Sequence, residues 1–358
     1  MSDSFTFKPL DKTTLKEQVT LFNKVFEKKW SVEEWEYINY GNPLSAGGNL
    51  VGVFDGDKLI GINSFMAMRY QYQGKTYNAL QSCNSAVDPN YQGKGLFKRL
   101  LTFAVDYYKD SGYDFIMGTP NPNSHPAFQK MGWTDMVDLR YLILQLNSNT
   151  LINRILKLHP PRCFNVFSGY LNLKRKLFAK ENPRQILERH TKLTPELSGF
   201  VSSLSNESFV MDNDYETLKW KLMDPSYIYY TVKENNQVVA FFVVREHPYI
   251  SITGKTAELI ESCYVSDELK ALKSAHGLFI TELRKNFDII FSWKALNSRM
   301  EKKILKASGY YDFHIRTPYI VKILTTDSEK QKLIQQKDLW NPQEIEFDTV
   351  VKFVEDNS

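Results

Sequence analysis

Apolar and polar positions along the chain alternate between the two-residue period of strands and the longer period of amphipathic helices. Residues 50–54 (LVGVF) and 58–68 (KLIGINSFMAM) flank an acidic, glycine-containing turn, which predicts a β-hairpin. Residues 96–111 (LFKRLLTFAVDYYKDS) place apolar side chains on one face of a helix. The apolar run 238–244 (VVAFFVV) is far shorter than the roughly 20 residues needed to cross a bilayer, so it predicts a buried strand.

The same order of predicted elements is found twice along the chain. A Trp-bearing helix runs into a proline at 33–43 and again at 215–225, and a hairpin follows in both places. A helix, a strand, an Asn-Ser pair, a short helix and a Gly-aromatic pair then follow in both halves. Each half therefore predicts strand–helix–helix–strand–strand–strand–helix–strand–helix–strand. This agreement favours an internal duplication over two unrelated α/β halves.

The duplication, together with the composition between the halves, predicts how the chain is divided. The segments are a first domain over 1–150, a basic helical connector over 151–195, a second domain over 196–326 and a C-terminal tail over 327–358, which ends in a short candidate strand. The connector carries ten Lys and Arg residues between Leu151 and Lys192, and Pro160-Pro161 is expected to divide it into two helices. Such a segment can contact an anionic membrane surface, but two amphipathic helices packed across the domains are favoured.

Composition and charge narrow the class of protein. Hydrophobic residues make up 42% and charged residues 24%, as in an ordinary globular protein. The excess of 45 Lys and Arg over 41 Asp and Glu gives a net charge of only +4, which does not indicate a nucleic-acid-binding protein. Cys83, Cys163 and Cys263 are too few for a disulfide scaffold, and the six histidines show no metal-binding spacing. The polar N-terminus does not resemble a signal peptide, so we expect a cytoplasmic protein without a metal.

The most informative local chemistry lies where one predicted strand meets a helix. The strand ends at Val87, Asp88-Pro89 turns the chain, and residues 92–95 (QGKG) lead directly into the helix. Glycines let the backbone approach a ligand closely, and the unpaired amides of a helix's first turn bind anions. The pattern therefore predicts a diphosphate site, although it fits neither GxxxxGK[ST] nor GxGxxG.

This segment, VDPNYQGKGLFKRLL, resembles motif A of the GNAT acyltransferase superfamily, [QR]-x-x-G-x-[GA] after a V-x-P strand end. Gln92 and Gly95 match the motif, whereas Phe97 replaces its last Gly or Ala. Residues 121–133 resemble the motif that follows in such enzymes, N-x-x-[AS]-x-x-x-Y-x-K-x-G-F, with Phe128 at the tyrosine position. Two motifs in the expected order make the resemblance specific.

The resemblance covers residues 5–145, and the second half shares only the arrangement of elements. At 273–277 (KSAHG) the second half keeps one glycine and lacks the V-x-P strand end. The resemblance implies an α+β or α/β fold of two tandem GNAT-like domains, of which the C-terminal copy is degenerate. Each domain would contain a mixed, mostly antiparallel twisted sheet flanked by helices. A single cofactor site would then lie in the first half.

The resemblance also implies the reaction and its co-substrate. Acetyl-CoA or another acyl-CoA would donate its acyl group to a primary amine of a small molecule that attacks the thioester directly. The diphosphate would bind main-chain amides in the 92–97 loop, and the thioester carbonyl would accept an amide near Ala86 or Val87. The residues so implied in cofactor binding are Ala86, Val87, Gln92, Gly93, Lys94, Gly95, Leu96, Phe97, Asn121, Ser124 and Phe128.

The family's acid and base cannot be transferred to this sequence. Phe128 replaces the tyrosine acid, and Gln81 stands where histone-type members carry a glutamate base. Because an amine is mostly ammonium at pH 7, a proton acceptor is still needed. His125 is the candidate, since it lies on the loop bordering the thioester and a histidine pKa near 6.5 suits proton transfer. A capping or packing role for His125 is the alternative.

Three functions are consistent with these residues. The preferred one is an N-acyltransferase that acts on a small-molecule amine, such as an amino sugar. A non-catalytic CoA-binding or regulatory module is the alternative that Phe128 and Gln81 favour. A Fem-type aminoacyl transferase is a third alternative, against which the diphosphate loop and the lack of a coiled-coil insertion argue. The sequence does not indicate an oligomeric state.

Overall fold

The first half of the chain forms the predicted order of elements. The computed structural model describes residues 5–45, 47–146, 182–201, 208–212, 214–246, 255–264 and 268–347. The first half contains β1 (Thr6–Leu10), α1 (Leu15–Phe26), α2 (Val32–Tyr40), β2 (Asn49–Asp55), β3 (Lys58–Tyr72), β4 (Lys75–Val87), α3 (Leu96–Tyr108), β5 (Phe115–Gly118), α4 (His125–Lys130) and β6 (Thr134–Gln145).

The second half repeats this order and adds one two-residue strand. It contains β7 (Gln185–His190), α7 (Pro195–Val201), β8 (Val210–Met211), α8 (Tyr215–Lys221), β9 (Ile228–Glu234), β10 (Gln237–Glu246), β11 (Thr256–Tyr264), α9 (Leu269–Leu283), β12 (Ile289–Lys294), α10 (Arg299–Ser308) and β13 (Tyr311–Ile323). The apolar run 238–244 lies in β10, and its residues from Ala240 to Val244 are fully buried. The chain then continues through α11 (Ser328–Ile334) and a 3-10 turn (Glu344–Glu346).

Three segments differ from the sequence-based expectations. Residues 185–190 form β7, which pairs with β9, so the predicted helical connector does not extend through them. Residues 151–181 of that connector lie outside the described residues. The second half's helix is expected from the sequence to start at His276 but begins at Leu269, so residues 273–277 lie inside α9 rather than in a loop. The tail contains α11, whereas all but Phe347 of its candidate last strand lies outside the described residues.

Local sequence signals explain where several elements begin. The Ser31 hydroxyl accepts a hydrogen bond from the Glu34 amide at 3.1 Å and so caps the start of α2. The Asp214 carboxylate caps α8 in the same way, through the Thr217 amide at 3.0 Å. Both helices are followed by a hairpin, β2–β3 in the first half and β9–β10 in the second.

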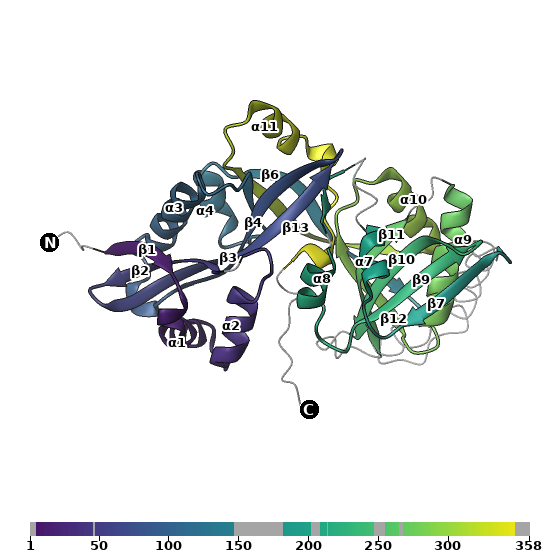
Figure 1. Ribbon diagram of the computed structural model, residues 1–358, viewed down its shortest axis with the longest axis horizontal. Coiled ribbons are helices and arrows are strands. Elements are labelled where there is room, and N and C mark those ends of the chain that lie inside the picture. The colour runs from purple at the N-terminus through teal and green to yellow at the C-terminus, as the bar shows by residue number, and fades with distance from the viewer. Residues whose placement is uncertain are drawn as a thin grey trace.

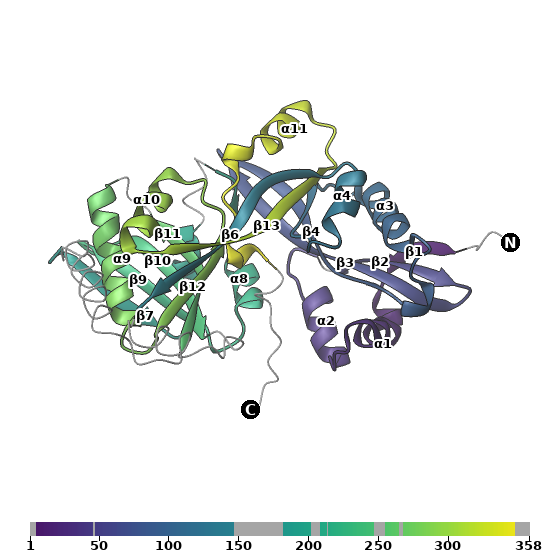
Figure 2. The ribbon, with the colours of Figure 1, turned by 180° about the vertical axis from the view of Figure 1, so that it is seen from behind.

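All described strands belong to one sheet that runs through both halves (Figures 1 and 2). Its order is β1-β2-β3-β4-β5-β13-β6-β12-β11-β10-β9-β7, with β8 beside β3. From either edge, four strands are joined in antiparallel pairs and the fifth is parallel to the fourth. The sixth strand comes from the other half: β13 pairs with β5, and β6 pairs with β12. Figure 2 shows β6 and β13 crossing the centre of the molecule.

Helices cover both faces of the first half's sheet. Val87 packs with the cluster formed by α3 and α4, whereas its neighbour Ala86 packs with α1 and α2. Successive side chains of a strand point to opposite faces, so the two helix pairs lie on opposite sides of β4. A third core joins the halves and includes Tyr70, Tyr319 and Trp340. The end of β4 is thereby held between two packed layers.

Candidate functional site

The strands β4 and β5 separate at their carboxyl ends. They pair only from Ala79–Phe115 to Gln81–Met117, whereas β4 continues along β3 as far as Val87. In the described part of the chain, no strand pairs with residues 82–87 on the side of β5, and we call this segment the open edge of β4. Residues 82–85 are half-buried. A free strand edge presents main-chain donors and acceptors to an extended ligand.

The register of β4 against β3 decides which amides this edge presents. The Asp88 amide donates to the Ile60 carbonyl at 2.8 Å, and the next pairs are Gly61–Val87, Ile62–Ala86 and Asn63–Ser85. Hydrogen-bonded and non-hydrogen-bonded pairs alternate in an antiparallel ladder. The amides of Val87 and Ser85 therefore point away from β3 towards the open edge, whereas that of Ala86 points to β3. Of Ala86 and Val87, the two residues expected to present an amide to the ligand, only Val87 has its amide directed to the open edge.

A β-bulge interrupts β4 within this edge. Asn63 is opposite Ser85 and Phe65 is opposite Ser82, so Cys83 and Asn84 together face a single residue of β3. Bulges twist a strand locally and redirect its side chains. The Asn63 side-chain amide reaches across, donating to the Ser85 hydroxyl at 2.6 Å and to the Ser82 hydroxyl at 3.4 Å. Ser85 was not identified from the sequence, because a bulge leaves no reliable mark in the alternation of side chains.

The loop after β4 leads into the first turn of α3. Gly93 and Gly95 have φ values of 79° and 70°, which residues with a side chain adopt only at an energetic cost. Gly95 is the N-cap of α3. The Gln92 amide donates to the Pro89 carbonyl at 3.4 Å, so this amide is already engaged. Among the described residues, none accepts a hydrogen bond from the amides of Gly95, Leu96 or Phe97. First-turn amides of this kind form an anion site.

Charged side chains hold this loop in place. Both oxygens of the Asp88 carboxylate lie 2.9 Å from the Lys24 ammonium, which donates to them. One of these oxygens also accepts the Asn90 amide at 3.0 Å. Burial alone would raise the pKa of Asp88, but these hydrogen bonds and the nearby Lys58 lower it below the usual value. The Lys94 ammonium lies 5.5 Å and 5.6 Å from the ring centres of Phe5 and Tyr91. On the β1 side of α3, Gly95 also borders an open depression of about 560 Å³.

The second sequence motif folds into the turn before α4. The Asn121 carboxamide oxygen accepts the amides of Asn123 and Ser124, both at 3.0 Å, so Asn121 shapes this turn. Ser124 is the N-cap of α4, although its hydroxyl makes no capping hydrogen bond. Phe128 is 6% exposed, and its ring centre lies 5.7 Å from that of Phe97. The structure thus brings together two of the residues that depart from the family motifs.

His125 lies at the start of α4 and is paired with a carboxylate. Its Nε2 lies 2.8 Å from Oδ1 of Asp135 on β6, and the Gln129 side chain donates to the other oxygen of that carboxylate at 3.0 Å. A carboxylate that orients an imidazole is a frequent partner of a general base. The sequence did not indicate Asp135, because the pairing depends on how β6 packs beside α4.

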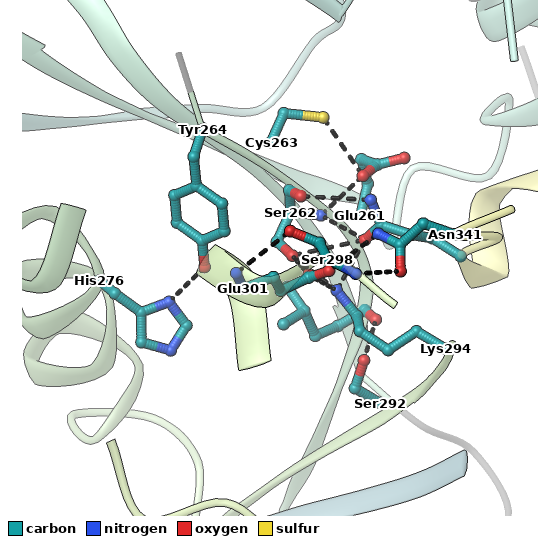
Figure 3. Close-up of polar contacts among 12 residues, drawn as sticks. Glu261, Ser262, Cys263, Tyr264, His276, Ser292, Lys294, Ser298, Glu301 and Asn341 are labelled. Carbon is teal, nitrogen blue, oxygen red and sulfur yellow. Dashed lines mark hydrogen bonds and ion pairs between the residues drawn. The ribbon is translucent and has the colours of Figure 1, made fainter. Parts of the chain in front are cut away.

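The corresponding edge in the second half is occupied by the chain itself (Figure 3). β11 pairs with β12 only from Thr256 to Glu258, so this pair separates as β4 and β5 do. Beyond that point, the Gln343 carboxamide accepts the Ser262 amide and donates to the Ser262 carbonyl, both at 3.2 Å. The fully buried Lys294 ammonium donates at 2.6 Å to Ser262, Glu301 and Gln343.

Helix α9 replaces the glycine loop in this half. His276 is fully buried within α9, and burial lowers its pKa to about 3. Its Nδ1 lies 2.8 Å from the Tyr264 hydroxyl at the end of β11. Only residues 265–268 separate β11 from α9, whereas residues 88–95 separate β4 from α3. The second half therefore lacks the length of chain that forms the first half's loop.

The described residues contain neither a metal-binding cluster nor a membrane-spanning helix. No group of three or more His, Cys, Asp and Glu side chains within the described ranges is arranged to hold a metal ion. Among the helices that the structure describes, none is long and apolar enough to span a membrane.

Comparison with known proteins finds a family match in the first half. Residues 6–136 match the family model of an acetyltransferase (GNAT) domain. No curated protein matches the chain.

Solved structures resemble nearly the whole chain. A GCN5-related N-acetyltransferase from Anabaena variabilis has a TM-score of 0.65 at 10% identity, covering 90% of this chain and 73% of that one. A probable N-acyltransferase of unknown function from Enterococcus faecalis has a TM-score of 0.65 at 11% identity, with the same coverage. N-myristoyltransferase from Saccharomyces cerevisiae, solved with myristoyl-CoA, has a TM-score of 0.54 at 13% identity. The match covers 90% of this chain and 79% of that one. At these identities the likeness establishes the fold, a mixed α/β architecture around a large, mostly antiparallel sheet.

Proposed function

We propose that this protein is an acyl-CoA-dependent N-acyltransferase that transfers an acetyl or other short acyl group to a primary amine of a small molecule. The observation that carries the proposal is the open edge of β4, followed through the loop 88–95 by first-turn amides of α3 that have no acceptor among the described residues. An acyl-CoA has an extended arm with amide groups and a diphosphate, and these two features suit such an edge and such a helix start. The GNAT domain match over residues 6–136 supports the same reaction class.

Each proposed contact follows from this geometry. The diphosphate would bind the 93–97 loop, with Lys94 adding positive charge. The pantetheine arm would pair with the open edge of β4 through Val87. The thioester carbonyl would accept the Ser85 amide, so that negative charge developing on its oxygen is stabilised where water is partly excluded. Asn121 and Ser124 would support the cofactor indirectly, by fixing the turn before α4.

His125 is proposed as the base that frees the attacking amine. The ammonium form must lose a proton before nitrogen can attack the thioester carbon. Asp135 holds the His125 ring through Nε2, which orients the imidazole. Phe128, at the family's acid position, has no proton to donate.

We also propose that the two halves are a tandem repeat with one cofactor site. The strand order, identical from either edge of the sheet, supports a duplication with exchanged last strands. The second copy is proposed to be structural, because Gln343 and Lys294 already bind the edge that a cofactor arm would need. Domains near 1–150 and 196–326 are retained as proposals, with β7 added to the second. A cytoplasmic location stays a prediction of the sequence.

Calorimetric titration tests the cofactor site. Acetyl-CoA, desulfo-CoA and ADP are each titrated into the full-length protein, and thiol release from acetyl-CoA is then followed against a panel of small primary amines that includes amino sugars. We expect one equivalent of acetyl-CoA to bind and at least one amine to accelerate thiol release. Absence of binding at millimolar acetyl-CoA would reject the proposal.

A CoA-binding module without turnover is the second candidate. Phe128 favours this alternative, because a phenylalanine at the family's acid position has no hydroxyl to donate a proton. Stoichiometric acetyl-CoA binding without thiol release for any amine in the panel would support this alternative and reject the transferase.

A further inference from the structure

The open edge of β4 carries two serines whose hydroxyl oxygens both accept from one buried side chain. Asn63 is 1% exposed, and its Nδ2 donates to Ser85 Oγ at 2.6 Å and to Ser82 Oγ at 3.4 Å. Its own carbonyl oxygen is buried and has no hydrogen-bond partner among the described residues. An unsatisfied buried polar atom costs stability, so a packing role alone does not account for an asparagine at this position.

The hydrogen bonds fix which proton remains available. A serine hydroxyl has one hydrogen to donate and two lone pairs to accept with. Because Ser85 Oγ accepts from Asn63, its own hydrogen is free to donate elsewhere, and no described residue accepts it. Donation from the amide to the oxygen also polarises the hydroxyl and strengthens its next hydrogen bond. Asn63 thus prepares Ser85 as a donor.

The Ser85 hydroxyl lies on the face of β4 towards α3 and α4. Val87 packs against the core cluster on that face, which includes Leu96 and Phe128. Residues two apart along a strand share a face, so the Ser85 side chain points the same way. Its main-chain amide points along the sheet into the open edge. Ser85 therefore offers two donors, an amide along the open edge and a hydroxyl on the face where the core cluster includes Phe128, the residue at the family's tyrosine position.

We propose that Ser85, polarised by Asn63, relays a proton from the attacking nitrogen to the departing sulfur, in place of the missing tyrosine. This inference rests on the proposed function. The neutral amine adds to the thioester carbon, forming the C–N bond while the Ser85 amide binds the oxyanion. As the C–S bond breaks, the Ser85 hydroxyl gives its hydrogen to sulfur and receives one from the ammonium-like nitrogen. The products are an N-acyl amide and a free thiol, so no other reactant is needed.

In the second half, Ser262 stands at the position that corresponds to Ser85, but its hydroxyl is not free to donate to a ligand. Ser262 lies on β11 opposite Phe242, in the region where β11 leaves β12. Its hydroxyl is bound by Lys294 at 2.6 Å and lies 2.9 Å from a carboxylate oxygen of Glu301. The Ser262 hydroxyl therefore both accepts and donates a hydrogen bond within the protein. Ser85 differs because its only described partner is a donor.

The test compares Ser85→Ala, Ser85→Thr and Ser82→Ala in steady-state assays of thiol release from acetyl-CoA. The acceptor is the amine that gives the highest turnover in the panel, and affinity for acetyl-CoA is measured in parallel by calorimetry. Ser85→Thr keeps a hydroxyl at the position. Ser82→Ala is the matched control, because it removes the longer contact and leaves the 2.6 Å hydrogen bond between Asn63 and Ser85 intact.

We expect Ser85→Ala to lower kcat by roughly 100-fold or more while the Kd of acetyl-CoA changes less than threefold. Added imidazolium buffer should partly restore the rate of Ser85→Ala and leave that of the wild type unchanged, which a purely structural role would not produce. Asn63→Ala should lower kcat less than Ser85→Ala does.

Each other outcome has a distinct meaning. A kcat for Ser85→Ala within threefold of the wild type would overturn the relay and leave the transferase proposal standing. Loss of acetyl-CoA binding in Ser85→Ala would also overturn it, since Ser85 would then serve binding. A wild-type protein that binds acetyl-CoA but releases no thiol would reject transferase and relay together.

Discussion

The rings of Phe97 and Phe128 meet edge to face, with ring centres 5.7 Å apart. Phe97 stands in the first turn of α3 and Phe128 in α4, so one contact joins the helices that follow β4 and β5. Phe128 also packs on Trp133 at 4.9 Å. The large side chain at the motif's Gly or Ala position thus has a partner, and the two departures from the family motifs compensate each other in packing.

A double-mutant cycle measures this compensation. Phe128→Ala should reduce the free energy of unfolding by about 3–5 kcal/mol, because a buried ring is removed. The coupling between Phe97→Ala and Phe128→Ala should be about 1 kcal/mol, as for other edge-to-face pairs. Urea unfolding of the four proteins gives both values. Strict additivity would show that the two rings are neighbours without energetic coupling.

Gly95→Val tests the anion site at the start of α3. Valine at a φ of 70° is strained, and its side chain would project towards the space before the first-turn amides, where a Cβ has no neighbour within 4 Å. We expect at least a tenfold loss of acetyl-CoA affinity and a stability loss of about 1–2 kcal/mol.

Gly112→Val is the matched control for this change. Gly112 follows the other end of α3, has a φ of 81° and is equally free of neighbours. Both substitutions therefore introduce similar backbone strain, but only one lies at the proposed site. Calorimetric titration and thermal unfolding compare them. Equal loss of affinity in both variants would mean that strain, not the loop, weakens binding.

Lys294→Met tests the buried cluster in the second half. The substitution leaves the Glu301 carboxylate buried without its 2.6 Å partner, so we expect a loss of about 3–5 kcal/mol in the free energy of unfolding. The double variant Lys294→Met/Glu301→Gln should recover part of that loss, because the buried charge is removed. Acetyl-CoA affinity should stay within twofold of the wild type in both variants. A large change in affinity would mean that the second half contributes to the cofactor site.

Glu346→Gln tests whether the stability of the protein depends on pH through a carboxyl group buried in the core between the halves. Burial raises the pKa of Glu346 to about 7, from an ordinary value of 4.5, and its carboxylate accepts the Tyr70 hydroxyl at 2.7 Å. Between these two pKa values the folded state binds the extra proton, so stability falls as pH rises from 4.5 to about 7. A shift of this size corresponds to roughly 3 kcal/mol.

The glutamine variant cannot titrate and should lose less stability than the wild type between pH 5 and pH 8. Urea unfolding at both pH values measures the difference. The same pH dependence in both proteins would exclude Glu346 as its source; Glu261, whose pKa burial also raises to about 7, would be examined next.

His125→Gln tests the proposed base. We expect kcat to fall by roughly 100-fold and the fall of the rate at acid pH to disappear, while acetyl-CoA affinity is retained. Asp135→Asn should lower kcat less, since it removes only the 2.8 Å partner that orients the ring. An unchanged pH profile of kcat in His125→Gln would assign His125 a structural role at the start of α4.

Local patterns determined much of the fold in advance. Alternation and turn residues predicted the hairpins at β2–β3 and β9–β10, and the paired glycines predicted the loop that opens α3. The reason is that hairpins, caps and glycine loops depend on residues close together in the sequence. The expected start of α9 at His276 was wrong by about two turns, because the buried side chains of Ala271, Leu272 and Ala275 extend the helix back to Leu269.

By itself, the sequence determined the order of helices and strands, the glycine loop proposed to bind a diphosphate, and the resemblance that points to acyl transfer. Tertiary structure alone decided that β6 pairs with β12 and β13 with β5, that the amide of Ser85 rather than that of Ala86 faces the open edge, and that Gln343 occupies the second half's edge. The physical reason is separation along the chain. A strand's register, a bulge and a contact across 81 residues are fixed by which surfaces pack together, and no short segment carries that information.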